Sequence, residues 1–421
     1  MIKKIEPGLS YFQSPSDASE SLQPLLEFAS QSLAERRIHN KVPVYLMATA
    51  GLRVLPSNRQ DELLSVVRSR LHAWVLDQRD TIFEFVDDYV RIISGQEEAL
   101  YSWVATNFVL GLLDSASTAA NQPVSKASKN VVELAGSSVQ VSFKVAESRF
   151  KKMSPEIRKD VLPLHLDFNA CVVETHPKHN VLVYAKSFEK RGANAARKLY
   201  LEKLLMYSKD KNAKSHHNLV LFDPCLHAAQ DEQWTILKES NEGNLVLLQG
   251  VSLKGKKTVR IVGNSNWEKC QEFVSSFFED ENQDLKSVLN VEANQLQNDR
   301  KDWIGLGDFL YSTNDIFNLD GELDRETFAE LSMEYCKRNW KSIWGLHNSK
   351  LQDQKPTVSE SRLRSQCFKA AYLLDVASPT QGREAIGITP YHVVSIAKFR
   401  SSWRFVKKCL SIRSIGLLVR P

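Results

Sequence analysis

The chain has 421 residues, of which 43% are hydrophobic and 25% are charged, a balance typical of a globular protein long enough for two domains. Its 55 basic and 50 acidic residues leave a net charge of +5, too small to indicate nucleic-acid binding without a concentrated patch. Collagen, coiled coil and wholesale disorder are excluded. No apolar run approaches the roughly 20 residues that cross a bilayer, and the N-terminus lacks the apolar core of a signal peptide.

The first third of the chain alternates between helix and strand patterns. Leucines and alanines at helical spacing predict a helix over 22–33. The run 42–47 is apolar on both faces, as in a buried parallel strand. The same helical spacing predicts helices over 63–74 and from about residue 96.

The middle of the chain begins with a predicted hairpin, in which a small-residue turn at 135–138 separates strands over 131–134 and 139–143. Further strands are predicted at 181–184 and 245–248, and a helix at 191–210. Strands and helices that alternate in two blocks predict an α/β protein of two lobes.

The turn Ala48-Thr49-Ala50-Gly51 directly follows the apolar strand. Ligands of open α/β sheets bind at the carboxyl ends of such strands, and small residues leave backbone N–H groups open to an anion. The alternative is an ordinary strand-to-helix turn.

Glu98 lies beside Glu97 at the start of an amphipathic helix. A carboxylate in this place can act as a general base toward water. Alternatively, it only complements the helix dipole.

The turn Ala135-Gly136-Ser137-Ser138 has the composition of a phosphate-binding hairpin. Glu133 before it is a candidate to hold a metal through water, and Gln140 after it a candidate to orient a nucleophilic water. The alternative is a plain tight hairpin.

Four strings together resemble, in order, the signature blocks of the apyrase and ecto-nucleotidase family of nucleoside phosphatases: KIEPGLSYF, VPVYLMATAGLR, VRIISGQEEALYSWVATNFVLG and VVELAGSSVQVSF. Later strings such as FDPCL, GNSNWEKC and YCKRNWKSIWG fit as well, so that the resemblance covers roughly residues 1–385. The spacing is similar to that of the membrane-associated plant apyrases.

This resemblance implies an α/β fold of two RNase-H-like lobes, as in actin and sugar kinases, with a nucleotide cleft between them. The implied domains are a partial N-terminal lobe over 1–93, a C-terminal lobe over 94–386 and a divergent tail over 387–421. The implied reaction is hydrolysis of the terminal phosphate of nucleoside di- or triphosphates by direct attack of water, with Mg²⁺ or Ca²⁺ as cofactor.

Site residues are implied position by position. Glu98 matches the catalytic base, while Ser138 and Gln140 match the pair that positions the attacking water. The remaining matches are phosphate-binding Thr49, Ala50, Gly136 and Ser137, metal-holding Glu133 (through water) and base-stacking Tyr311. Phosphoryl transfer suits this set because it needs positioning and charge neutralisation more than covalent chemistry.

The six cysteines form no Cys-x-x-Cys pair, so spacing alone leaves open both buried thiols and disulfides. The resemblance implies disulfides Cys225–Cys270 and Cys336–Cys367, with Cys171 and Cys409 unpaired. It also implies a secretory-pathway compartment, in the Golgi or at the cell surface. Membrane association is expected only through a segment outside this chain.

Three departures from the family pattern affect the expected activity. The Asp-x-Gly-Ser-type first phosphate loop is absent, and so is the C-terminal block after Ile386. The second loop carries Glu133 and Ala135 where the family has Asp and Gly. We therefore expect weak or no activity, with a catalytically dead nucleotide-binding or scaffold homologue as the alternative.

Nucleic acid is not expected as a partner. The basic stretch 186–214 and the basic tail invite that interpretation, but the aromatic residues of the stretch are spaced as in a helix core rather than on an open platform.

Overall fold

The computed structural model describes residues 5, 8–34, 42–77, 83–110, 112–113, 128–166, 179–211, 219–239, 245–249, 257–295, 303–319, 323–352, 358–378, 388–390 and 415–419. Contacts divide the chain into two compact units. Unit 1 is Met1–Glu189 with His392–Pro421, and unit 2 is Lys190–Tyr391. The division by contacts falls after Glu189 and Tyr391, and the expected lobe boundaries after residues 93 and 386 stay a prediction.

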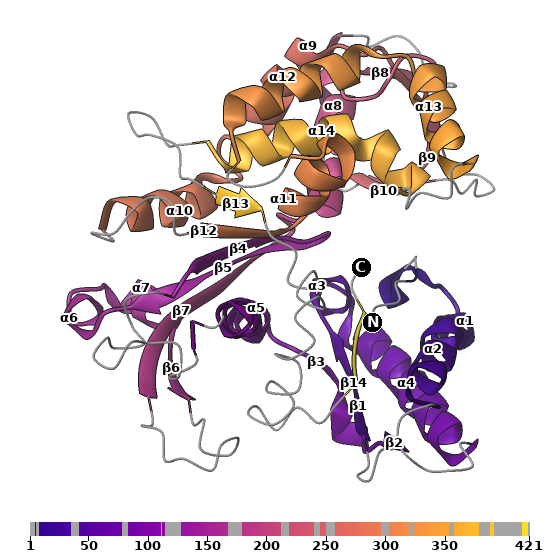
Figure 1. The fold of residues 1–421 in the computed structure, drawn as a ribbon. Coiled ribbons are helices and arrows are strands. Elements are labelled where there is room, and N and C mark those ends of the chain that lie inside the picture. Colours follow the sequence, from indigo (N-terminus) through magenta and orange to yellow (C-terminus); the bar gives the residue numbers. More distant parts are fainter. Residues whose placement is uncertain are drawn as a thin grey trace. The chain divides into compact units, whose positions relative to one another are not determined.

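The first sheet of unit 1 is built around β1 (Val42–Ala48), which pairs in parallel with β2 (Phe83–Glu84), β3 (Val90–Ile92) and β14 (Ile415–Val419). The predicted buried parallel strand is therefore confirmed. Leu46 of β1 shares a core with leucines of the surrounding helices, which Figure 1 shows beside the sheet. The elements around the sheet are η1 (Leu9–Tyr11), α1 (Pro15–Glu20), α2 (Gln23–Ala34), α3 (Ala50–Arg53), α4 (Ser57–Asp77) and η2 (Asp87–Tyr89).

The second group of strands in unit 1 is antiparallel. The strands β4 (Asn130–Leu134), β5 (Ser138–Val145), β7 (His179–Glu189) and β6 (Val161–Leu166) pair in that order. β4 and β5 form the predicted hairpin. Helix α5 (Gly95–Val109) contacts β4, β5 and β7 (Figure 1), while α6 (Glu147–Phe150) and α7 (Pro155–Arg158) lie in the connection that follows β5.

Unit 2 contains a four-stranded sheet in the order β10-β9-β11-β8, in which only β11 and β8 pair in parallel. Its strands are β8 (Leu219–Asp223), β9 (Asp231–Glu239), β10 (Leu245–Gln249) and β11 (Lys257–Gly263). Two further strands of this unit, β12 (Trp303–Gly307) and β13 (Ile388–Pro390), pair in parallel. Its helices are α8 (Ala193–Lys211), α9 (Trp267–Phe278), α10 (Gln283–Gln295), α11 (Asp308–Leu310), the π-helical η4 (Tyr311–Asp315), α12 (Arg325–Lys337), α13 (Trp340–Gln352) and α14 (Glu360–Val376).

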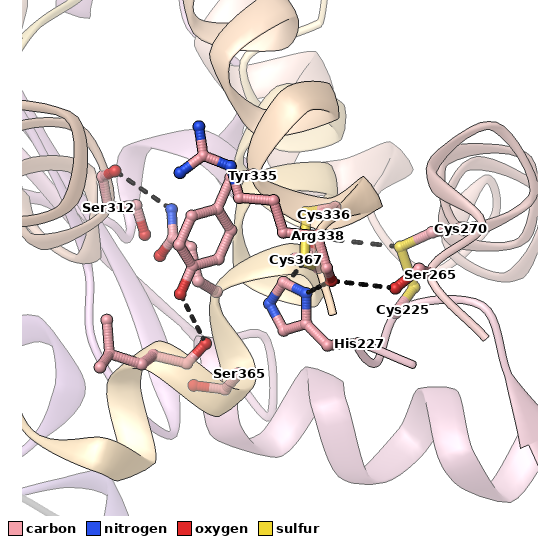
Figure 2. The surroundings of a disulfide bond; sticks show 12 residues. Cys225, His227, Ser265, Cys270, Ser312, Tyr335, Cys336, Arg338, Ser365 and Cys367 are labelled. Atoms are coloured by element: carbon pink, nitrogen blue, oxygen red, sulfur yellow. Dashed lines mark hydrogen bonds between the residues drawn. A yellow bond between two sulfur atoms is a disulfide. The ribbon is translucent and has the colours of Figure 1, made fainter. Parts of the chain in front are cut away.

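Both predicted disulfides are confirmed in unit 2, because Cys225 bonds Cys270 and Cys336 bonds Cys367. Beside the second bond, Nε2 of the buried His227 lies 3.5 Å from Sγ of Cys367, and its Nδ1 donates to the carbonyl of Arg338 at 3.0 Å (Figure 2).

Cys171 and Cys409, which are expected to be unpaired, lie outside the described residues. Within the described residues, no helix is both long and apolar enough to cross a membrane.

Candidate active site

The start of α5 is fixed by its capping residue, Ser94. Oγ of Ser94 accepts from N–H of Glu97 at 3.0 Å, and Oε2 of Glu97 accepts from N–H of Ser94 at 2.8 Å, which is a complete capping box. Burial raises the pKa of Glu97, but these bonds and the Arg91 guanidinium outweigh it and leave the pKa below its ordinary value. Glu97 is thus the residue of this pair that closes the capping box.

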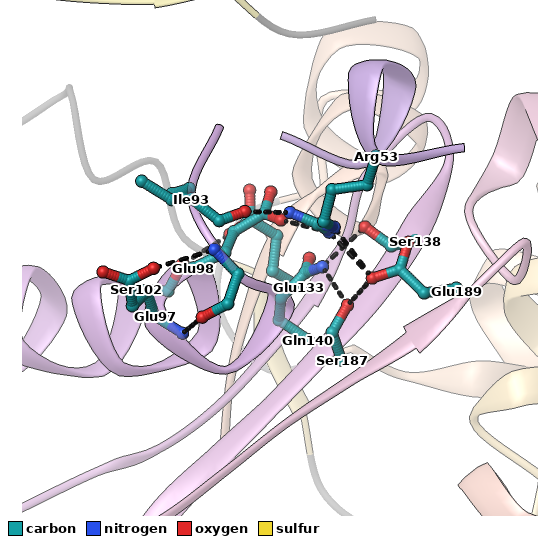
Figure 3. Close-up of polar contacts among 11 residues, drawn as sticks. Arg53, Ile93, Glu97, Glu98, Ser102, Glu133, Ser138, Gln140, Ser187 and Glu189 are labelled. Carbon is teal, nitrogen blue, oxygen red and sulfur yellow. Dashed lines mark hydrogen bonds and ion pairs between the residues drawn. The ribbon is translucent and has the colours of Figure 1, made fainter. Parts of the chain in front are cut away.

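Glu98 points inward instead, and its side chain is only 10% exposed. Its Oε2 accepts from Nη2 of Arg53 at 2.8 Å, an ion pair between two mostly buried side chains (Figure 3). Arg53 is the last residue of α3 and also donates to the carbonyl of Ile93 at 3.0 Å. The turn after β1 is therefore tied directly to the loop that precedes α5.

The register of the antiparallel strands gathers polar side chains on one face. Glu133 of β4 lies opposite Gln140 of β5, and Gln140 lies opposite Ser187 of β7. Ser138 pairs with Glu189 two residues further along, and alternate residues of a strand point to the same face. Three of the predicted site residues, Glu133, Ser138 and Gln140, therefore lie together.

Gln140 is completely buried, and within the described ranges the structure gives hydrogen bonds to its amide nitrogen but not to its amide oxygen. Its Nε2 donates to Oγ of Ser138 at 2.6 Å and to Oγ of Ser187 at 3.0 Å. Its carbonyl oxygen Oε1 is buried and has no hydrogen-bond partner among the described residues. A buried acceptor without a donor costs about 1–3 kcal/mol, so this oxygen is placed to accept from something that enters the site, such as a water molecule.

Glu133 is 2% exposed, and its Oε2 accepts from Oγ of Ser102 on α5 at 2.6 Å. Across the described ranges, no three His, Cys, Asp or Glu side chains gather as a set that could hold a metal ion. One carboxylate with serine hydroxyls nearby is a hard, oxygen-only donor set, which suits an ion such as Mg²⁺ or Ca²⁺ reached through water rather than by a protein cage.

The two predicted phosphate-binding turns adjoin strands of unit 1: one follows β1 and the other joins β4 to β5. Thr49, which follows β1, and Ala50, the first residue of α3, are both buried. Gly136 and Ser137 are half-buried in the β4–β5 turn, which is closed by a 3.1 Å hydrogen bond from N–H of Ala135 to the carbonyl of Ser138. Their contact with phosphate stays a prediction.

Tyr311, the predicted base-stacking residue, belongs to unit 2 and is half-buried. The guanidinium of Arg362 lies 4.0 Å from its ring centroid, and Arg362 also pairs with Asp315 at 3.1 Å. A cation therefore contacts a face of this ring.

Sequence reasoning missed four side chains that complete the site: Arg53, Ser102, Ser187 and Glu189. Arg53 is the last letter of a recognised signature string. Ser187 and Glu189 flank the buried Phe188, so their period-two alternation could have indicated a polar face at the end of a strand.

Comparison with known proteins identifies the family of the chain. The model of the GDA1/CD39 (nucleoside phosphatase) family matches residues 1–382. Ectonucleoside triphosphate diphosphohydrolase 7 of Xenopus tropicalis is 26% identical over 398 residues, covering 89% of this chain and 60% of that protein. Nucleoside-diphosphatase mig-23 of Caenorhabditis elegans is 26% identical over 393 residues, covering 89% of this chain and 63% of that protein.

The chain thus spans about 60% of the length of the curated relatives it matches. The crystal structure of nucleoside triphosphate hydrolases from Neospora caninum superposes with a TM-score of 0.50 at 15% identity, over 90% of this chain and 75% of that one. This likeness confirms the predicted α/β fold of the actin and sugar-kinase type. The family match over most of its length shows that the chain belongs to the GDA1/CD39 family of nucleoside phosphatases.

Proposed function

We propose that this chain hydrolyses nucleoside di- or triphosphates to the lower phosphate and orthophosphate by direct attack of water. The observation that carries the proposal is Gln140, a buried amide whose nitrogen is fixed by two serines and whose oxygen has no partner among the described residues. A site that orients water needs such an acceptor beside fixed hydroxyl groups.

Each remaining role is assigned to a residue of the same unit. Glu98 takes the proton from the attacking water, while Ser138 and Gln140 hold that water in line. Thr49, Ala50, Gly136 and Ser137 bind phosphate oxygens. Mg²⁺ or Ca²⁺, held through water by Glu133, supplies neutralisation of phosphate charge when bound.

The test compares phosphate release from ADP and ATP, with Mg²⁺ or Ca²⁺, by the wild type and by Glu98→Gln. Loss of a general base lowers kcat by roughly 10²–10⁴-fold. Glu97→Gln is the matched control, because Gln also serves at this position of a capping box and activity is expected to persist. Equal turnover by wild type and Glu98→Gln would refute the assignment.

A second candidate is nucleotide binding without turnover, in line with the expectation of impaired activity. The observation that favours it is the ion pair of Glu98 with Arg53, because a nearby opposite charge makes a carboxylate a weaker base. Saturable binding of a non-hydrolysable ADP analogue by a wild type that releases no phosphate would establish this alternative.

We also infer an oxidising compartment of the secretory pathway. The two disulfides of unit 2 support this, because such bonds persist where thiols are not kept reduced. Immunofluorescence of the full-length gene product with Golgi and cell-surface markers tests the inference, and a cytosolic signal would contradict it.

A further inference from the structure

Arg53 is shared by two carboxylates. Besides its 2.8 Å bond to Glu98, its Nη2 lies 2.8 Å from Oε1 of Glu189, and its Nε donates to the same oxygen at 3.1 Å. One carboxylate oxygen of Glu189, the last residue of β7, therefore accepts two hydrogen bonds from Arg53.

The same Glu189 oxygen also connects to the water-orienting amide. Oγ of Ser187 donates to Oε1 of Glu189 at 2.9 Å and accepts from Nε2 of Gln140 at 3.0 Å. An unbroken line of polar contacts thus runs from Gln140 through Ser187, Glu189 and Arg53 to Glu98 (Figure 3).

We propose that Glu189 and Ser187 are positioning residues for hydrolysis: Glu189 offsets the charge of Arg53 so that Glu98 is held in place yet stays basic, and Ser187 fixes the amide of Gln140. The inference rests on the proposed function, because Glu98 and Gln140 take their roles from it. Neither Glu189 nor Ser187 needs to touch the nucleotide.

Several other charged residues around the start of α5 already have ion-pair partners of their own. Glu97 is paired with Arg91 at 2.7 Å, and Lys186 of β7 lies 3.7 Å from Asp160, so these charges are already balanced. Glu133 of β4 accepts from Ser102. Arg53 pairs with Glu98, and Glu189 is the second carboxylate on Arg53.

The sign of the effect follows directly. A positive neighbour favours the charged form of a carboxylate and lowers its pKa, whereas a negative neighbour raises it. In Glu189→Gln, the positive charge of Arg53 is no longer partly neutralised by a second carboxylate. The repulsion between the negative charges of Glu189 and Glu98 is also lost. The pKa of Glu98 should therefore fall by about one unit, which is a tenfold change in its ionisation equilibrium.

The first readout is the pH dependence of kcat/KM for phosphate release, whose acid limb reports the base of the free enzyme. Glu189→Gln should move that limb down by about one pH unit. Glu189→Asp keeps the charge and should leave it in place, as should Glu147→Gln, an exposed glutamate of the same unit. Ser187→Ala should lower kcat by roughly tenfold with KM unchanged, because the orientation of the water by Gln140 is lost.

The second readout does not depend on turnover. In protein labelled with [5-¹³C]glutamate, the Glu98 carboxyl signal is identified by its absence from Glu98→Gln, and its titration midpoint is compared in wild type and Glu189→Gln. A lower midpoint in Glu189→Gln supports the role of Glu189, and an unchanged midpoint overturns it. A wild type that releases no phosphate would refute the proposed function, while this titration would still decide whether Glu189 governs Glu98.

Discussion

Gly95, the first residue of α5, offers a sharp test of the site geometry. A methyl group at this position would lie 2.9 Å from Oγ of Ser187 and 2.9 Å from Oε1 of Glu189, and it would overlap Cβ of Ser187. Because Cβ of Ser187 is fixed to the backbone of β7, no side-chain rotation can relieve this overlap. In Gly95→Ala, either α5 or β7 must shift.

The expected magnitude combines two opposing effects. Overpacking of this kind costs about 1–3 kcal/mol, while replacing Gly by Ala in a helix gains up to about 1 kcal/mol. We therefore expect unit 1 to lose about 1–2 kcal/mol of unfolding free energy. The functional effect should be larger, because a shift approaching 1 Å at the start of α5 moves Glu98 and costs up to about 10²-fold in turnover.

The assay pairs urea unfolding with phosphate release, and α13 provides the matched control. Gly345 is exposed in that helix, and a methyl group there meets no atom within 4 Å. Gly345→Ala should therefore stabilise the protein by up to about 1 kcal/mol and leave activity unchanged. If Gly95→Ala instead behaves like Gly345→Ala, then α5 does not approach β7 as closely as described, and the network through Ser187 and Glu189 is refuted.

Two further predictions concern unit 2. Replacing either disulfide by a pair of alanines should cost about 4 kcal/mol, because the sequence separations of 45 and 31 residues are long, and a urea midpoint equal to that of the wild type would contradict this. Burial lowers the pKa of His227 to about 4 against an ordinary value of 6.5, so unfolding binds a proton between these values. Stability should fall by about 3 kcal/mol as the pH drops from 7 to 4, and His227→Asn should show a shallower dependence in urea unfolding at both pH values.

Local sequence patterns sufficed for most elements that hold the site. The run 42–47 is apolar on both faces, a pattern typical of a buried parallel strand, and β1 forms there with parallel neighbours. The small residues at 135–137 break one strand pattern from the next, and the β4–β5 hairpin turns there. These features depend on neighbours in sequence, so their physical cause is visible in the sequence itself.

Long-range register was not accessible in the same way. Gln140 and Ser187 are 47 residues apart, and they meet only because β5 and β7 pair in one register. A shift of one residue would turn Ser187 to the other face of the sheet.

The neighbouring glutamates of α5 show where local reasoning stops. Successive residues of a helix are rotated by about 100°, so Glu97 and Glu98 cannot both face the sheet, and the spacing Ser94-x-x-Glu97 marks the first of them as the capping residue. The local sequence therefore indicates that Glu98, rather than Glu97, points toward the interior. It does not reveal that the partner there is Arg53, 45 residues earlier, nor that a second carboxylate shares that partner. Because an arginine alone would weaken Glu98 as a base, the proposed role of Glu98 depends on Glu189, a residue outside the recognised signature strings.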